Sequence, residues 1–144
     1  MSAPPPPEDY QSPGCQRILV VDDDPLILRM VEEKLHRTGY QVFTARSGQD
    51  GLDVIKRRGL PHLAIVDIMM PGMSGFELCR AVHEFSDLPV IMLSAVHEEE
   101  TIIQGIRHHA EDYITKPFSL RELIARVERV LRRVVISRSR AGRR

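Results

Sequence analysis

Three adjacent carboxylates follow the first apolar run of this sequence, and something must compensate their charge. The run ILVV leads directly into Asp22, Asp23 and Asp24, which are followed by Pro25. Burying a carboxylate is costly unless a cation or hydrogen bonds stabilise it. Asp24 has an ordinary explanation, because an aspartate placed directly before a proline is typical of a helix N-cap. Asp22 and Asp23 are left over, and they predict a cation site.

Polar side chains also end three later apolar runs. Asp67 follows LAIV, Ser94 follows VIML and Lys116 follows YIT. The carboxyl ends of parallel strands meet at one edge of a sheet, so we expect these groups to converge with Asp22 and Asp23. Converging carboxylates favour a hard divalent cation such as Mg²⁺, which keeps water for a substrate to replace. Asp67 is then the candidate nucleophile toward phosphorus, with Lys116 and Ser94 contacting the phosphoryl oxygens.

The elements that must position these groups alternate along the chain. Short apolar runs predict strands at 18–21, 42–45, 63–66, 90–93 and 113–115. Amphipathic segments predict helices at 25–38, 48–59, 75–85, 97–108 and from 120 onward, the last after a capping box formed by Ser119 and Glu122. This alternation indicates an α/β fold, a flavodoxin-like doubly wound parallel sheet of order 2-1-3-4-5 with helices on both faces. In the first helix we expect one apolar face made by Leu26, Ile27, Met30, Val31 and Leu35.

The 144 residues predict one domain with short flanking segments. Residues 1–15 are rich in proline and are predicted to be a disordered leader, residues 16–134 form the domain, and residues 135–144 form a basic tail or interdomain linker. Net charge zero argues against binding nucleic acid through the overall field. Cys15 and Cys79 form no metal-binding spacing, and no apolar run is long enough to span a membrane. These features favour a cytoplasmic protein.

Four stretches, ILVVDDDP, IVDIMMPGMSGFEL, PVIMLSA and EDYITKPF, resemble the signature blocks of the receiver domain of two-component response regulators. The resemblance covers about residues 16–134 and keeps every block in order. It implies that Asp67 becomes an aspartyl phosphate, with the phosphoryl group supplied by a sensor histidine kinase. It also implies that Asp23, Asp67 and the backbone carbonyl of Met69 bind Mg²⁺, while Asp22 acts mainly through water.

The resemblance extends to the residues that change on phosphorylation and to the partners. It implies that Ser94 and Tyr113 form a switch pair and that the Lys116–Pro117 peptide is cis. The run DYITKPFSLRELIARV is similar to the winged-helix class of transcription regulators, whose receivers dimerise through helix 4, strand 5 and helix 5. In that class a basic residue on helix 4 pairs with the acid at Glu122; this chain has Ile102 there, which argues against the usual homodimer. DNA would be bound only by an output domain beyond this chain.

Two other functions compete with a phosphorylation-controlled switch. A Mg²⁺-dependent phosphohydrolase of the haloacid dehalogenase type would use Asp22 and Asp24 as its DxD motif. Against it, Pro25 and Leu26 depart from the usual ending of that motif, and Asp67 would have no role. A protein that binds DNA by itself is excluded on length, because no recognition helix remains after the five strand–helix units are assigned. The switch, a phosphoacceptor rather than an enzyme with a free substrate, is therefore the prediction.

Overall fold

The structure is a computed structural model that describes residues 16–95 and 110–141, with side chains up to residue 134. Its strands are β1 Arg17–Val21, β2 Gln41–Ala45, β3 Leu63–Asp67, β4 Val90–Ala95 and β5 Asp112–Lys116. Its helices in the described part are α1 Pro25–Thr38, α2 Gly48–Arg58, α3 Gly75–His83 and α5 Leu120–Ala141. The predicted helix at 97–108 lies outside the described residues, and so does Ile102.

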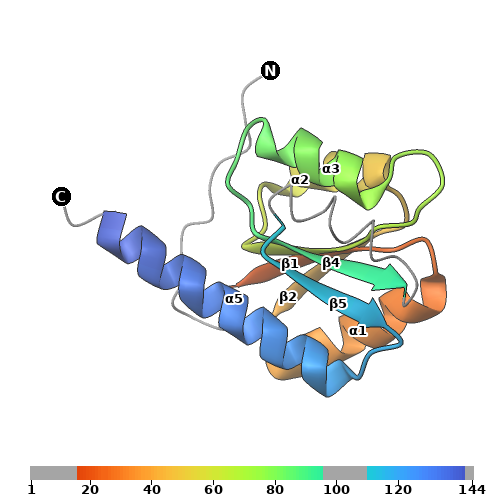
Figure 1. Cartoon of the computed structure of the whole chain (residues 1–144). Coiled ribbons are helices and arrows are strands. Elements are labelled where there is room, and N and C mark those ends of the chain that lie inside the picture. Colours follow the sequence, from red (N-terminus) through yellow and green to blue (C-terminus); the bar gives the residue numbers. More distant parts are fainter. Residues whose placement is uncertain (1–15, 96–109, 142–144) are drawn as a thin grey trace.

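The five strands form one parallel sheet of order β2-β1-β3-β4-β5, which confirms the predicted fold. Helices α2 and α3 cover one face of the sheet, and α1 and α5 cover the other (Figure 1). In the register of the central strands, Val21 pairs with Val66, and Asp67 pairs with Leu93. The residues that leave β1, β3 and β4 therefore lie along one edge of the sheet.

Strand β3 shows how burial and sequence are connected in this fold. All five of its residues, LAIVD, are buried, because helices cover both faces of the sheet at its centre. A strand covered on both faces carries a continuous apolar run rather than an alternating one. Asp67 is the first charged residue after that run, so it lies where the chain leaves the core. Its place at the end of β3 is a consequence of the apolar pattern before it.

Side-chain caps begin the helices as the sequence predicted. The Asp24 carboxylate accepts a hydrogen bond from the N–H of Leu26 at 2.9 Å, with Pro25 as the first helical residue. The Ser119 hydroxyl accepts one from the N–H of Glu122 at 3.0 Å. Caps of this kind stabilise a helix by about 1 kcal/mol each.

The predicted apolar face of α1 is wrong in part. Leu28, Val31 and Leu35 are buried, whereas Leu26 is 63% exposed and Met30 is 45% exposed. The buried residues follow one stripe of the helix, at spacings of three and four. Leu26 and Met30 are also four apart, so periodicity alone could not decide which apolar stripe would face the sheet.

Helix α5 is longer than the domain boundary at residue 134 anticipated. It continues to Ala141, so most of the segment predicted as a tail or linker is helical. The sequence allows this, because after Pro117 neither glycine nor proline occurs before Gly142. Among the described helices, α5 included, none combines the length and apolar character needed to cross a bilayer.

Candidate functional site

Three carboxylates converge at the edge of the sheet, as the sequence predicted. Asp22 and Asp23 follow β1, Asp67 ends the neighbouring β3, and each offers an oxygen such that the three atoms lie within 4.8 Å of one another. Asp22 is completely buried, Asp67 is 6% exposed and Asp23 is exposed. The cluster therefore has two acids held in the protein and one that faces solvent, an arrangement that could hold a metal ion.

Lys116 connects the last strand to this cluster. Its Nζ lies 3.0 Å from Oδ2 of Asp22 and 3.4 Å from Oδ2 of Asp67. The other oxygen of Asp22, Oδ1, accepts a hydrogen bond from the N–H of Asp24 at 2.9 Å. Both oxygens of Asp22 thus have protein partners. The sequence predicted that Lys116 would converge with Asp22, but not that these two side chains would pair, because the directions of side chains in the folded protein decide which groups at a sheet edge make contact.

The charges in the cluster do not balance within the protein. Burial, together with the charge of Asp22, raises the pKa of Asp67 to about 6, although Lys116 and the N–H of Met69 act in the opposite direction. Burial by itself would lower the pKa of Lys116, but the hydrogen bond and charge of Asp22, together with Asp67, raise it. One ammonium group thus faces three carboxylates. Oxygen ligands with surplus negative charge suit a hard divalent cation.

Met69 and Pro117 stand next to the cluster. The Met69 N–H donates to Oδ1 of Asp67 at 3.4 Å, and its side chain is 61% exposed. The Lys116–Pro117 peptide is cis, as the resemblance implied. Asp24 does not join the cluster, because its carboxylate caps α1 and is exposed. A DxD site built from Asp22 and Asp24 therefore has no counterpart in this geometry.

The predicted switch pair consists of two buried hydroxyl groups. Neither Ser94 Oγ nor the Tyr113 hydroxyl has a hydrogen-bond partner among the described residues. Ser94 is 1% exposed near the end of β4. Tyr113 is half-buried and packs against the apolar core that lies between the sheet and helices α2 and α3; Cys79 belongs to this core. Burial raises the pKa of Tyr113 to about 12, with Cys79 adding to the effect. A buried hydroxyl without a partner costs about 1–3 kcal/mol, so both groups can gain by acquiring one.

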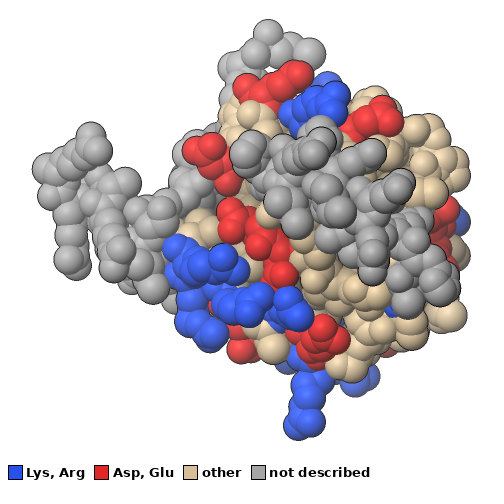
Figure 2. All heavy atoms as spheres, in the orientation of Figure 1, with Lys and Arg blue, Asp and Glu red and all other residues tan. Residues whose placement is uncertain are grey.

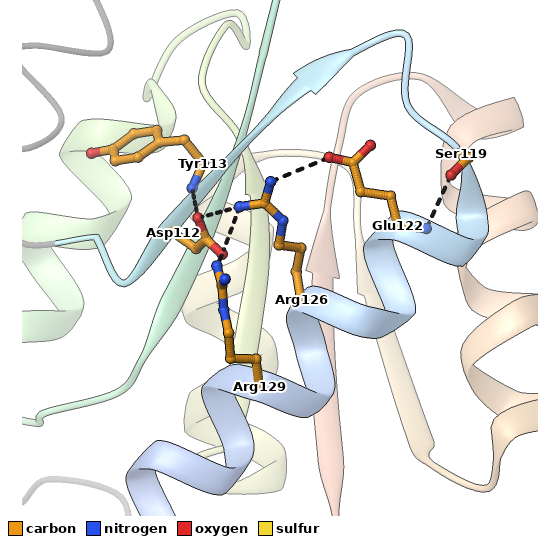
Figure 3. Close-up of polar contacts among 6 residues, drawn as sticks. All are labelled: Asp112, Tyr113, Ser119, Glu122, Arg126 and Arg129. Carbon is orange, nitrogen blue, oxygen red and sulfur yellow. Dashed lines mark hydrogen bonds and ion pairs between the residues drawn. The ribbon is translucent and has the colours of Figure 1, made fainter.

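A polar network at the start of β5 was missed by the sequence reasoning. On the face drawn in Figure 2, a group of basic side chains lies next to acidic ones. Asp112 accepts hydrogen bonds from the Tyr113 N–H at 2.9 Å, from Arg126 at 2.9 and 3.1 Å and from Arg129 at 2.6 Å (Figure 3). Arg126 also lies 3.4 Å from Glu122. The sequence did contain a signal for this network: Asp112 begins a strand, and Arg126 and Arg129 lie three residues apart on the helix that follows.

This network affects the titration of Asp112 and gives Glu122 a partner on its own helix. Burial by itself raises the pKa of Asp112, but the Tyr113 N–H and the guanidinium groups of Arg129 and Arg126 outweigh it and hold the pKa below its ordinary value. Glu122 finds its partner, Arg126, one turn later on its own helix. In the part of the chain described, the acid that a dimer of the winged-helix class would use is thus already paired.

An apolar groove of about 360 Å³ adjoins the carboxylate cluster. It lies between α1 and the chain that links β5 to α5, and Lys116 contributes to it. Its lining is formed by Ile27, Met30, Val31, Lys116, Pro117, Phe118 and Leu120. The exposed side chain of Met30 belongs to this lining, so the misassigned face of α1 borders the functional site.

Comparisons with known proteins agree with this geometry. The family described as response regulator receiver domain matches residues 18–128. "Probable transcriptional regulator ycf27" of Porphyridium aerugineum is 43% identical over 119 residues, which is 83% of this chain and 49% of that protein. The ycf27 protein of Porphyra purpurea is 44% identical over 82% of this chain and 48% of its own length. The chain thus spans about half the length of these curated relatives.

Solved structures give the same result. NtrX from Brucella abortus superposes with a TM-score of 0.83 at 34% identity, covering 89% of this chain and 29% of NtrX. The chemotaxis protein CheY4 of Vibrio cholerae has a TM-score of 0.74 at 31% identity, covering 80% of this chain and 98% of CheY4. These matches give no support to the haloacid dehalogenase alternative.

Proposed function

This chain belongs to the response regulator receiver family, a phosphorylation-controlled switch, and we propose that Asp67 is the residue on which it is phosphorylated. The observation that carries the proposal is the position of the Asp67 carboxylate. It is 6% exposed, its Oδ2 lies 3.4 Å from the Lys116 ammonium, and it belongs to the cluster with Asp22 and Asp23. Among the described carboxylates only Asp22 shares a cationic neighbour and that cluster, but Asp22 is completely buried. Its partners also lie closer, at 2.9 and 3.0 Å, than the partners of Asp67, which lie at 3.4 Å.

The residues divide the work of phosphoryl transfer among them. Asp23, Asp67 and the Met69 carbonyl would hold Mg²⁺, with Asp22 nearby, and the bound ion supplies positive charge beside the phosphoryl oxygens. An Asp67 carboxylate oxygen attacks phosphorus while the bond from phosphorus to the donor atom breaks, and the donor keeps the electron pair. Asp22 holds Lys116 in place, so its ammonium can pair with a phosphoryl oxygen once Asp67 is esterified.

We expect the conformational switch to result from the oxygens that the phosphoryl group adds at Asp67. A phosphoryl group brings negative charge and hydrogen-bond acceptors. We expect the buried Ser94 hydroxyl, which has no partner among the described residues, to donate to one of them. We expect movement of Ser94 to change the packing of Tyr113 and thus the face made by helix 4, β5 and α5. We propose transcription as the output, through a domain beyond this chain, because the curated relatives named transcriptional regulators are about twice as long.

We propose that the groove beside Lys116 receives the phosphoryl donor protein. A sensor histidine kinase must bring a phosphohistidine to Asp67, and the groove continues from that site along α1. Met30, which belongs to the lining, is 45% exposed, and Leu26, on the same helix but outside the lining, is 63% exposed. We propose that a helix of the kinase next to its phosphohistidine packs here, since exposed apolar patches commonly mark interaction sites.

Labelling with a small acyl phosphate and Mg²⁺ tests the acceptor assignment. Intact-mass measurement should show one added phosphoryl group on the wild-type chain and none on Asp67→Asn. Asp53→Asn is the matched control, because Asp53 is an exposed acid of α2 and should leave labelling unchanged. Full labelling of Asp67→Asn, with its fold intact by circular dichroism, would overturn the proposal.

A further inference from the structure

Helix α3 begins in direct contact with the main chain of the acceptor. The Gly75 N–H donates to the Ile68 carbonyl at 2.9 Å. A Cβ built on Gly75 would lie 2.5 Å from the carbonyl oxygen of Asp67 and 2.9 Å from Cα of Ile68. Both atoms belong to the backbone, so neither can rotate away as a flexible side chain would. The present contact therefore requires a residue without a side chain at position 75.

Backbone conformation does not explain this glycine. The described glycines with positive φ are Gly39, Gly59 and Gly72, and Gly75 is not among them. Gly75 is the first residue of α3, where alanine would be the better helix former. Only the close approach to residues 67 and 68 accounts for glycine here.

The same contact bears on where the Asp67 carboxylate lies. Asp67 pairs with Leu93 of β4, and the Ile68 N–H donates to the Leu93 carbonyl at 3.0 Å. On the other side, α3 rests on the main chain of Asp67 and Ile68 through Gly75. The peptide that follows the acceptor is thus fixed between β4 and α3.

We propose that Gly75 is a positioning residue for phosphoryl transfer, which holds Asp67 in place by letting α3 rest on its main chain. The inference depends on the proposed role of Asp67. Ordinary contact begins at 3.4 Å, so a methyl group at position 75 would force α3 and the Asp67 carbonyl apart by about 0.9 Å. A displacement of about 1 Å at a reacting group can slow a reaction by about 100-fold.

The test compares Gly75→Ala with wild type and with Gly51→Ala. A Cβ at Gly51, on α2, would lie 3.2 Å from Cγ2 of Val21 and 3.5 Å from Leu78, so it meets side chains and not the acceptor. The measured quantity is the first-order labelling rate at saturating acyl phosphate and Mg²⁺. We expect Gly75→Ala to be about 10- to 100-fold slower than wild type and Gly51→Ala to stay within about threefold.

Each outcome decides for or against the inference. Wild-type labelling of Gly75→Ala with a native circular dichroism spectrum would overturn it. If Gly75→Ala is partly unfolded, the three proteins are compared in sucrose at a concentration that restores the native spectrum. A rate that then returns to the wild-type value would show a purely structural role and overturn the proposal, whereas a slow rate in the folded variant supports it. Failure of the wild-type chain itself to label would instead refute the role of Asp67.

Discussion

Replacing Asp112 with asparagine removes one charge from the network that joins β5 to α5 and keeps the size of the side chain. The carboxylate accepts hydrogen bonds from Arg126 at 2.9 and 3.1 Å and from Arg129 at 2.6 Å. An asparagine oxygen can still accept from the Tyr113 N–H or one guanidinium group, but its amide nitrogen would face the other. We expect the chain to fold and to lose stability at neutral pH.

The size of the loss follows from how exposed the partners are. The side chain of Asp112 is 13% exposed, that of Arg126 is 33% exposed and that of Arg129 is 51% exposed. Charged hydrogen bonds contribute about 1.5–3 kcal/mol when buried, whereas exposed pairs contribute about 0–1 kcal/mol. Discounting for solvent leaves about 1–2 kcal/mol for the network. For a domain of this size that corresponds to a decrease in Tm of about 4–8 °C.

The pH dependence of this stability has a definite sign. The pKa of Asp112 is lower in the folded chain than its ordinary value of 3.8, so the folded state favours the charged carboxylate. Its contribution is therefore fully present above pH 3.8 and is lost as the pH falls through the folded pKa. The difference in unfolding free energy between wild type and Asp112→Asn should be constant near pH 7. It should decrease only when the pH falls below 3.8.

Urea unfolding followed by circular dichroism at several pH values measures this difference. Glu122→Gln is the matched control, because Glu122 is 45% exposed and lies 3.4 Å from Arg126. It should cost less than about 0.5 kcal/mol. The reasoning fails if Asp112→Asn is as stable as wild type at pH 7, or if its deficit grows as the solution becomes more acidic.

Three further outcomes test the site. Asp23→Ala should abolish Mg²⁺-dependent labelling, whereas Asp24→Ala should keep it and lose about 1 kcal/mol of stability with the helix cap; the opposite pattern in a labelling assay would move the metal site. The phosphorylated chain should be long-lived because the side chains of Met69 and Val96, two residues beyond Asp67 and Ser94, cannot position a water by hydrogen bonding; Val96 lies outside the described residues. The Met69→Asn, Val96→Glu double variant should lose phosphate faster, and unchanged decay would contradict this. Met30→Glu should slow transfer from a histidine kinase that phosphorylates the wild-type chain but not labelling by acyl phosphate, and equal slowing of both would exclude a docking role.

The sequence determined the elements and their order. Apolar runs of three or four residues, separated by amphipathic segments with serine or aspartate caps, predicted the strands and helices that the structure contains in its described part. The same pattern predicted that Asp22, Asp23, Asp67 and Lys116 would meet at one sheet edge, and they do. These inferences succeeded because caps and periodicity are local, and because a parallel sheet brings every strand end to the same edge.

The tertiary structure decided which groups contact each other at that edge and around it. Lys116 pairs more closely with Asp22 than with Asp67, α1 turns Met30 outward, and Asp112 gathers two arginines of α5. The contact of Gly75 with the Asp67 main chain also appears only in three dimensions. Pairing at 3 Å depends on strand register, helix rotation and the approach of segments far apart in sequence. A shift in strand register or a rotation of a helix would leave the local sequence pattern unchanged but would alter these contacts.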